Sequence, residues 1–179
     1  RREGSSKFGA NNKWGTFPSV SLGWTISNEE FMKGIDWLNN LKLRAGYGKT
    51  GVIPGSSYQS LTRYSYNAGY FYDNGVWNQG LGVASNPNPD LKWETSTEFN
   101  VGLDWSVLED RLGGSIDVYR KNTSDMLWWY DVPTPPNLYS QTLMNVGKMR
   151  NQGIEIAINA IPVQTKDFQW KTVLTASHN

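Results

Sequence analysis

The feature that most constrains the fold is an alternation of apolar and polar residues with a period of two. Between Ser19 and Ser27 the even positions are apolar and the odd positions are small or polar. Successive side chains of a β-strand point to opposite faces, so this run predicts a two-faced strand. The same alternation recurs near residues 41–48, 98–105, 112–119, 154–160 and 168–177, which predicts about six strands. The polar lead-in from Arg1 to Phe8 is predicted to end a seventh.

The composition excludes several classes of protein. The chain has 179 residues, no cysteine, a single histidine (His178) and a formal net charge of +1. Disulfide frameworks, thiolate metal sites and histidine-based catalysis are therefore not expected within it. The basic residues form no stripe, so a nucleic-acid partner is not expected. We expect no catalytic residue, metal or cofactor. No apolar run is long enough for a transmembrane helix.

The connections between the predicted strands alternate between short and long. Val107–Arg111 and Ile161–Asp167 are short, and Pro162 is expected to end a strand. Residues from Thr50 to about Leu91, and from about Asp131 to Val146, form long connections. Short turns at one end and long loops at the other are typical of transmembrane β-barrels. A compact soluble domain rarely contains a structureless loop of about 40 residues.

One link at the short-turn end, Ser27–Asn40, is predicted to be helical. It begins with the pattern of a capping box, Ser27 followed by Glu30. Phe31, Ile35 and Leu38 then recur at a helical spacing. This predicts a short amphipathic helix at the rim of the sheet.

The polar face of the strands carries charged side chains. A soluble sandwich could turn such a face to solvent, and a barrel could turn it to a water-filled lumen. The residues predicted to face the lumen are Lys42, Arg44, Glu98, Asp104, Asp117 and Glu155.

Aromatic residues are abundant, with nine Trp and nine Tyr. Trp24, Trp93, Trp105 and Trp170 stand on apolar faces near strand ends, which predicts interfacial girdles or, alternatively, a sandwich core. Other aromatics lie in or beside the long loops, where they could contact a substrate or a lid protein, or pack the loops together. The residues predicted to make the substrate or lid contact are Tyr70, Tyr72, Trp77, Trp128, Trp129, Tyr130 and Tyr139.

Two weak motifs suggest other functions, nucleotide binding and glycoside hydrolysis. Gly46–Gly51 matches G-x-G-x-x-G, yet it runs into a Pro- and Gly-containing loop instead of opening a helix, so nucleotide binding is not expected. Acidic residues such as Asp104 and Asp117 could suggest a glycoside hydrolase. They lie on different predicted strands, and nothing in the sequence argues for a raised pKa.

Several longer segments resemble the barrel of the SusC/RagA family of TonB-dependent transporters. The resemblance covers nearly the whole chain in order and weakens only in the two long loops. The segments that carry it are Arg2–Gly9, Asn11–Gly15, Phe17–Trp24, Leu41–Gly48, Asn88–Glu94, Arg111–Leu112, Ser115–Asp117, Asn145–Lys148 and Asn151–Glu155.

The resemblance implies that residues 1–179 are part of a 22-stranded barrel domain in the bacterial outer membrane. The plug domain, the TonB-contacting segment and the remaining strands are expected to lie outside this chain. Family members import glycans or peptides with a SusD-like surface lipoprotein, are driven by TonB, and catalyse no bond change. The alternatives that the residues leave open are a soluble all-β carbohydrate-binding module and a fragment of a glycoside hydrolase.

Overall fold

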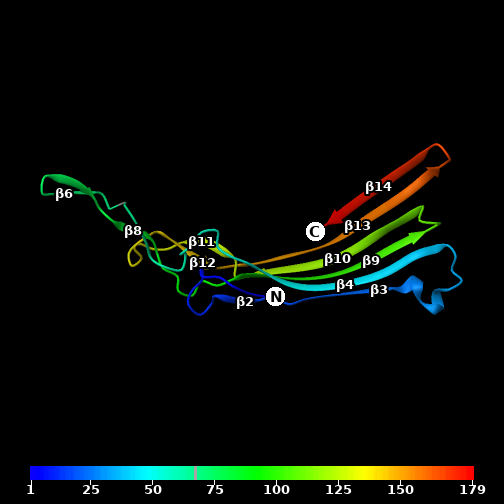
Figure 1. The fold of residues 1–179 in the computed structure, drawn as a ribbon, viewed down its shortest axis with the longest axis horizontal. Helices are drawn as coiled ribbons and strands as arrows, with labels where there is room; N and C mark the ends of the chain where they lie inside the picture. The colour runs from blue at the N-terminus through cyan, green and yellow to red at the C-terminus, as the bar shows by residue number, and fades with distance from the viewer. Residues whose placement is uncertain (67) are drawn as a thin grey trace. The chain divides into compact units, whose positions relative to one another are not determined.

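The computed structural model describes residues 1–66 and 68–179, and its main element is one antiparallel sheet of six long strands. Figure 1 shows these strands side by side in the order β14-β13-β10-β9-β4-β3. Each predicted run of alternation lies within one of them or extends past its end by at most two residues, so all six predicted strands are confirmed. Their bounds are β3 Ser19–Thr25, β4 Leu38–Val52, β9 Glu94–Val107, β10 Leu112–Ser124, β13 Lys148–Gln164 and β14 Gln169–His178.

The register between neighbouring strands keeps the two faces chemically separate. In the β3–β4 pair, Leu22 lies opposite Ala45 and Trp24 opposite Leu43, while Gly23 lies opposite Arg44. The β13–β14 pair continues the rule, for example with Ile158 opposite Leu174 and Ala157 opposite Thr175. A slip of one residue would exchange the faces, so the alternation specifies this register. Large apolar side chains on one face stay exposed, among them Leu22, Val118 and Leu174.

The predicted end of a seventh strand in Arg1–Phe8 is present as a short strand, but in the part of the chain that the structure describes this strand does not join the six-stranded sheet. Within the described residues, β1 (Arg2–Gly4) pairs only with β2 (Trp14–Thr16), as a separate two-stranded ribbon. The tight return at 5–13 brings the two strands together, because the Ser5 amide donates to the Lys13 carbonyl.

The long connections contain hairpins that the alternation did not predict. In the first connection, β5 (Arg63–Ser65) pairs with β8 (Gly82–Ser85), and β6 (Tyr70–Asp73) pairs with β7 (Val76–Gln79). In the second, β11 (Leu127–Asp131) pairs with β12 (Gln141–Asn145).

The predicted helix at Ser27–Asn40 is replaced by two short 3₁₀ turns, Ile26–Asn28 and Glu30–Met32. No side chain caps either turn, so the expected capping box does not form. Leu38 already belongs to β4, which leaves too few residues for a stable α-helix. Among the described residues, no helix is both long and apolar enough to cross a membrane.

The expectation that Pro162 ends a strand is also wrong, because β13 continues to Gln164. The pairing with β14 shifts register between Ala160 and Val163, so Ile161 and Pro162 together oppose one residue of β14. A bulge tolerates proline because the residue there need not donate to the ladder.

The chain divides into two compact units, and the boundary falls within β4, β9, β10 and β13. We call them the sheet unit (Pro18–Lys49, Thr97–Asn122, Arg150–Asn179) and the loop unit (Arg1–Phe17, Thr50–Ser96, Thr123–Met149).

The loop unit has its own hydrophobic core. Its buried members are Phe8, Phe17, Leu91, Trp93 and Leu143. The Trp93 ring lies 4.8 Å from Phe8 and 5.1 Å from Phe17, measured between ring centroids. Trp93 is only 8% exposed, so the prediction that it belongs to an interfacial girdle is wrong. Trp24 and Trp170 are exposed on the sheet unit, and the Trp24 indole donates to Glu29 Oε1 at 2.9 Å.

A substitution at Gly9 tests how closely the loop unit is packed. A β-carbon at Gly9 would overlap the carbonyl oxygen of Pro89, whereas one at Gly55 would have no neighbour within 4 Å. Because the obstacle is backbone, we expect Gly9→Ala to destabilise the loop unit by about 1–3 kcal/mol and Gly55→Ala by much less. Hydrogen exchange of the Leu91 amide region in the intact protein measures both. Equal effects of the two variants would contradict the close contact.

Candidate functional site

An ion cluster joins three strands on the polar face of the sheet unit. The guanidinium of Arg44 on β4 binds Asp104 on β9 in a bidentate manner, with Nε 2.7 Å from Oδ2 and Nη2 2.8 Å from Oδ1. The same Nη2 lies 2.9 Å from Oδ1 of Asp117 on β10. Planar, two-point pairing fixes the guanidinium in one orientation. Three of the predicted lumen residues therefore meet at one place.

Gly102 on β9 makes room for this cluster. A β-carbon there would lie 2.6 Å from Arg44 Nη2 and 2.8 Å from Arg44 Cζ, and would also overlap Asp117 Oδ1. The absent side chain lets the guanidinium cross β9 to reach β10. Sequence reasoning identified the charges but missed this glycine, which only the cross-strand register shows.

The other predicted lumen residues are not in the cluster. Lys42 is half-buried on β4, while Glu98 on β9 and Glu155 on β13 are exposed. Within the parts of the chain that the structure describes, none of the three forms an ion pair. Their facing a lumen stays a prediction.

We expect Arg44→Met to destabilise the sheet by roughly 1 kcal/mol, because it leaves two neighbouring carboxylates without their cation. The effect is modest because all three side chains are about a third exposed and water screens them. Lys42→Met is the matched control and should change the free energy of unfolding by less than about 0.5 kcal/mol. A double-mutant cycle with Asp104→Asn measures the coupling. A coupling energy of zero would show that the cluster does not stabilise the sheet.

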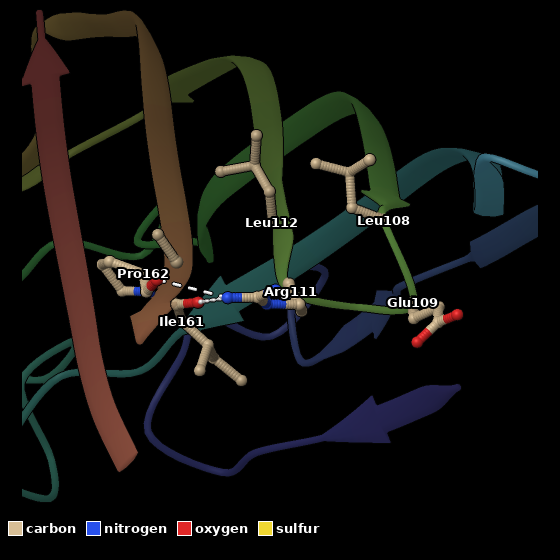
Figure 2. A pocket seen from close by; sticks show the side chains of 7 residues that line it. Leu108, Glu109, Arg111, Leu112, Ile161 and Pro162 are labelled. Atoms are coloured by element: carbon tan, nitrogen blue, oxygen red, sulfur yellow. Dashed lines mark hydrogen bonds between the residues drawn. The ribbon is translucent and has the colours of Figure 1, made fainter. Parts of the chain in front are cut away.

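A hollow at the short-turn end is lined by Leu108, Glu109, Arg111, Leu112, Ala160, Ile161 and Pro162. Figure 2 shows the Arg111 side chain reaching from the β9–β10 turn to the bulge of β13. Arg111 Nη2 donates to the carbonyl oxygens of Ile161 and Pro162, at 3.4 and 3.2 Å, and the Ile161 amide donates back to the Arg111 carbonyl at 2.7 Å. Because the guanidinium is bonded to backbone carbonyls, Arg111 connects the β9–β10 turn to the bulge of β13, and we assign this hollow a structural role.

The β9–β10 turn itself is conformationally strained. Leu108, Glu109 and Asp110 have φ values of 56°, 57° and 62°, a region that costs a non-glycine residue about 1–2 kcal/mol. Asn39 on β4 offsets this cost, because its Oδ1 accepts from the amides of Glu109 and Asp110, at 2.9 and 3.4 Å. The turn is therefore fixed from β4 on one side and β13 on the other.

Aromatic side chains form an exposed surface on the β6–β7 hairpin of the loop unit. Tyr72 lies directly opposite Trp77, with ring centroids 5.3 Å apart, and Tyr70 shares their face two residues along the strand. All three are exposed. Three of the predicted contact residues are thus brought together. Neighbouring aromatic faces with polar edges can stack on sugar rings or on peptide side chains.

The β11–β12 hairpin divides its three predicted contact residues between two faces. Trp129 lies opposite the buried Leu143, whereas Trp128 and Tyr130 lie on the other face and are more exposed. The backbone of Tyr139 is fixed by Asn86, whose Oδ1 accepts from the Tyr139 amide at 3.0 Å. Trp128 and Tyr130 are therefore the two most exposed aromatic side chains on strand β11 of this hairpin. Across residues 1–66 and 68–179, no group of three or more His, Asp or Glu side chains could hold a metal ion.

Comparison with known families gives a match over the whole chain. The family profile described as "TonB dependent receptor-like, beta-barrel" matches residues 1–179. The TonB-dependent receptor P39 of Formosa agariphila is 42% identical over 180 residues, which cover 100% of this chain and 17% of that protein. The TonB-dependent receptor SusC of Bacteroides thetaiotaomicron is 40% identical over 185 residues, with 100% and 18% covered. The chain spans less than a fifth of the length of these relatives.

A solved structure agrees with the sequence matches. The RagAB peptide importer in its "closed-closed" state superposes with a TM-score of 0.84 at 30% identity, covering 97% of this chain and 18% of that chain. The six-stranded sheet with one exposed apolar face is thus a portion of a large barrel wall. This outcome favours the barrel over the soluble carbohydrate-binding module.

Proposed function

Because the chain belongs to the TonB-dependent receptor β-barrel family of the bacterial outer membrane, and within it to the SusC/RagA type, we propose that it forms part of the wall of an active nutrient importer. The observation that carries this proposal is the two-faced sheet. One face exposes Leu22, Val118 and Leu174, and the opposite face carries the Arg44 cluster. A barrel wall between lipid and a water-filled lumen needs that division.

On this proposal the polar face lines the lumen. Lys42, Glu98 and Glu155 would then offer hydrogen bonds to a plug domain or to passing cargo, whereas Arg44 already binds its two carboxylates. Asp104 and Asp117 share one guanidinium, which supports a role in joining strands over the glycoside hydrolase alternative. We therefore propose that the chain catalyses no reaction and holds no cofactor.

The loop unit supplies the surface for cargo or for a partner. Exposed aromatics on β6–β7 and β11–β12 suit a glycan or peptide and also suit a protein lid. The solved relative RagAB is described as a peptide importer, which supports peptides as one cargo class. We propose a SusD-like surface lipoprotein as the lid, and TonB as the source of energy through a segment outside this chain.

Uptake by the native host tests the proposal. Deleting the gene should abolish uptake of either labelled oligosaccharides or labelled oligopeptides, and supplying the intact gene should restore it. Inactivating TonB should have the same effect as the deletion. Uptake that persists without TonB would contradict active import, and hydrolysis of the cargo by the purified receptor would support the enzyme alternative.

A further inference from the structure

Side-chain amides join the two long connections within the loop unit. We call residues 86–93 the strap, since their hydrogen bonds follow β12 in chain order. Asn86 binds the backbone near the start of β12, Asn88 Nδ2 donates to the Leu143 carbonyl at 2.8 Å, and the Lys92 amide donates to Asn145 Oδ1 at 2.9 Å. These bonds take the place of a regular β-ladder between strap and hairpin.

Asn86 makes the densest of these contacts. Its Nδ2 donates to the Tyr139 carbonyl at 2.6 Å and to Thr142 Oγ1 at 2.9 Å, and its Oδ1 accepts from the Tyr139 amide at 3.0 Å. Both Asn86 and Thr142 are buried. Removing the Asn86 amide therefore leaves the buried Thr142 hydroxyl and the part-buried backbone groups of Tyr139 without this partner, which is more costly than losing a solvated bond.

The other end of the strap is also bonded to the hairpin, through more exposed contacts. Asn145 Nδ2 donates to the carbonyls of Lys92 and Asp125, at 2.7 and 2.9 Å, and Lys92 Nζ lies 3.0 Å from Asp125 Oδ1. Between these ends, Leu91 of the strap and Leu143 of the hairpin belong to one buried cluster. The strap thus contacts β12 along its whole length.

We propose that the β11–β12 hairpin is ordered only while the strap is bound to it, so that the strap controls the presentation of Trp128 and Tyr130. A two-stranded hairpin alone is marginally stable in water. Beyond its pairing with β11, β12 is bonded to the strap through Asn86, Asn88 and Lys92. The inference rests on the proposed function in one respect, that these two aromatics contact cargo or lid. Opening of the hairpin then requires release of the strap, and the two connections move together.

Hydrogen exchange of the intact receptor in detergent tests this dependence without any ligand. Asn86→Ala should raise the exchange rates of amides in 127–145 and in 86–93 by about tenfold, with β3, β4 and β14 unchanged. Asn137→Ala is the matched control, because among the described residues Asn137 Nδ2 donates only to the nearby Pro133 carbonyl at the hairpin tip. It should leave both segments at the wild-type rates.

A milder variant covers the case in which Asn86→Ala fails to fold. Thr142→Val removes one acceptor of Asn86 with little change in shape, and should raise exchange in the same two segments by a smaller factor. Unchanged exchange in 127–145 for a folded variant, or a rise there without a rise in 86–93, would overturn the proposal. If a host with the wild-type receptor takes up neither oligosaccharides nor oligopeptides, the import function is refuted. The dependence of hairpin exchange on the strap is unaffected by that outcome.

Discussion

Replacing Leu174 with lysine is expected to destabilise the barrel by about 2–4 kcal/mol, because the ammonium group would enter the hydrocarbon region of the membrane. Leu174 lies opposite Ile158 on the apolar face and is 64% exposed in the sheet unit. The measurement is the urea midpoint of unfolding of the intact receptor in lipid vesicles, together with the folded fraction recovered from cell membranes.

The neighbouring residue provides a matched control. Thr175 lies opposite Ala157 on the polar face, so Thr175→Lys should change stability by less than about 0.5 kcal/mol. Because a protein core would also reject Lys at 174, a spin label on Leu174→Cys separates the two environments. The label should be accessible to oxygen dissolved in lipid and shielded from a water-soluble nickel chelate. The reverse result would sink the assignment of this face to lipid.

Truncating Leu91 to alanine should destabilise the loop unit by about 2–5 kcal/mol, through lost burial and a residual cavity. Leu91 is 0% exposed and its carbonyl accepts from the Gly9 amide at 3.0 Å, so the site cannot easily collapse. The readout is the free energy of local opening from hydrogen exchange of residues 8–17 and 86–93.

Leu138→Ala is the corresponding control within the same unit. Leu138 is 75% exposed, so its truncation should change the free energy of opening by less than about 0.5 kcal/mol. Comparable losses for Leu91→Ala and Leu138→Ala would mean that Leu91 is not in a core. Loss confined to residues 86–93 would mean that the segment 8–17 does not pack on it.

The period-two alternation was sufficient to predict the six long strands, because each has one apolar and one polar side. Runs such as 98–105 lie wholly inside the observed strand β9. It did not predict β6 or β12, which are short and lack the alternation. β12 is stabilised by contacts with a distant segment, for example Asn86 with Thr142, and a local pattern does not carry that information. β6 instead pairs with β7 across the local Asn74–Gly75 turn, a signal of turn chemistry and not of alternation.

Side-chain environments were harder to predict than strands. Trp93 looked like Trp24, since each stands on an apolar position near a strand end. Its burial depends on Phe8 and Phe17, which lie far away in the sequence. Phe31, Ile35 and Leu38 do recur at a helical spacing. Because β4 begins at Leu38, however, the residues of the last expected helical turn belong to a strand.

The charged residues of the polar face could be identified from their alternate positions along each strand, but their grouping into a cluster could not be predicted. The alternation assigns a residue to a face and does not say which residue lies beside it on the next strand. The contact of Arg44 with Asp117 requires the register of three strands and the absence of a side chain at Gly102.

The make-up of the loop unit has a consequence for the order of folding. Within the sheet, the pairs β3–β4, β9–β10 and β13–β14 join strands that are neighbours among the six in chain order, whereas β4–β9 and β10–β13 join strands separated by the long connections. The loop unit joins Trp93 to Lys13, 80 positions away, and Asn86 to Thr142, 56 positions away. Contacts of such long range form slowly, because the intervening chain must first be confined. The loop unit is therefore expected to form late, once its last segment, up to Met149, is available to pack on the earlier ones.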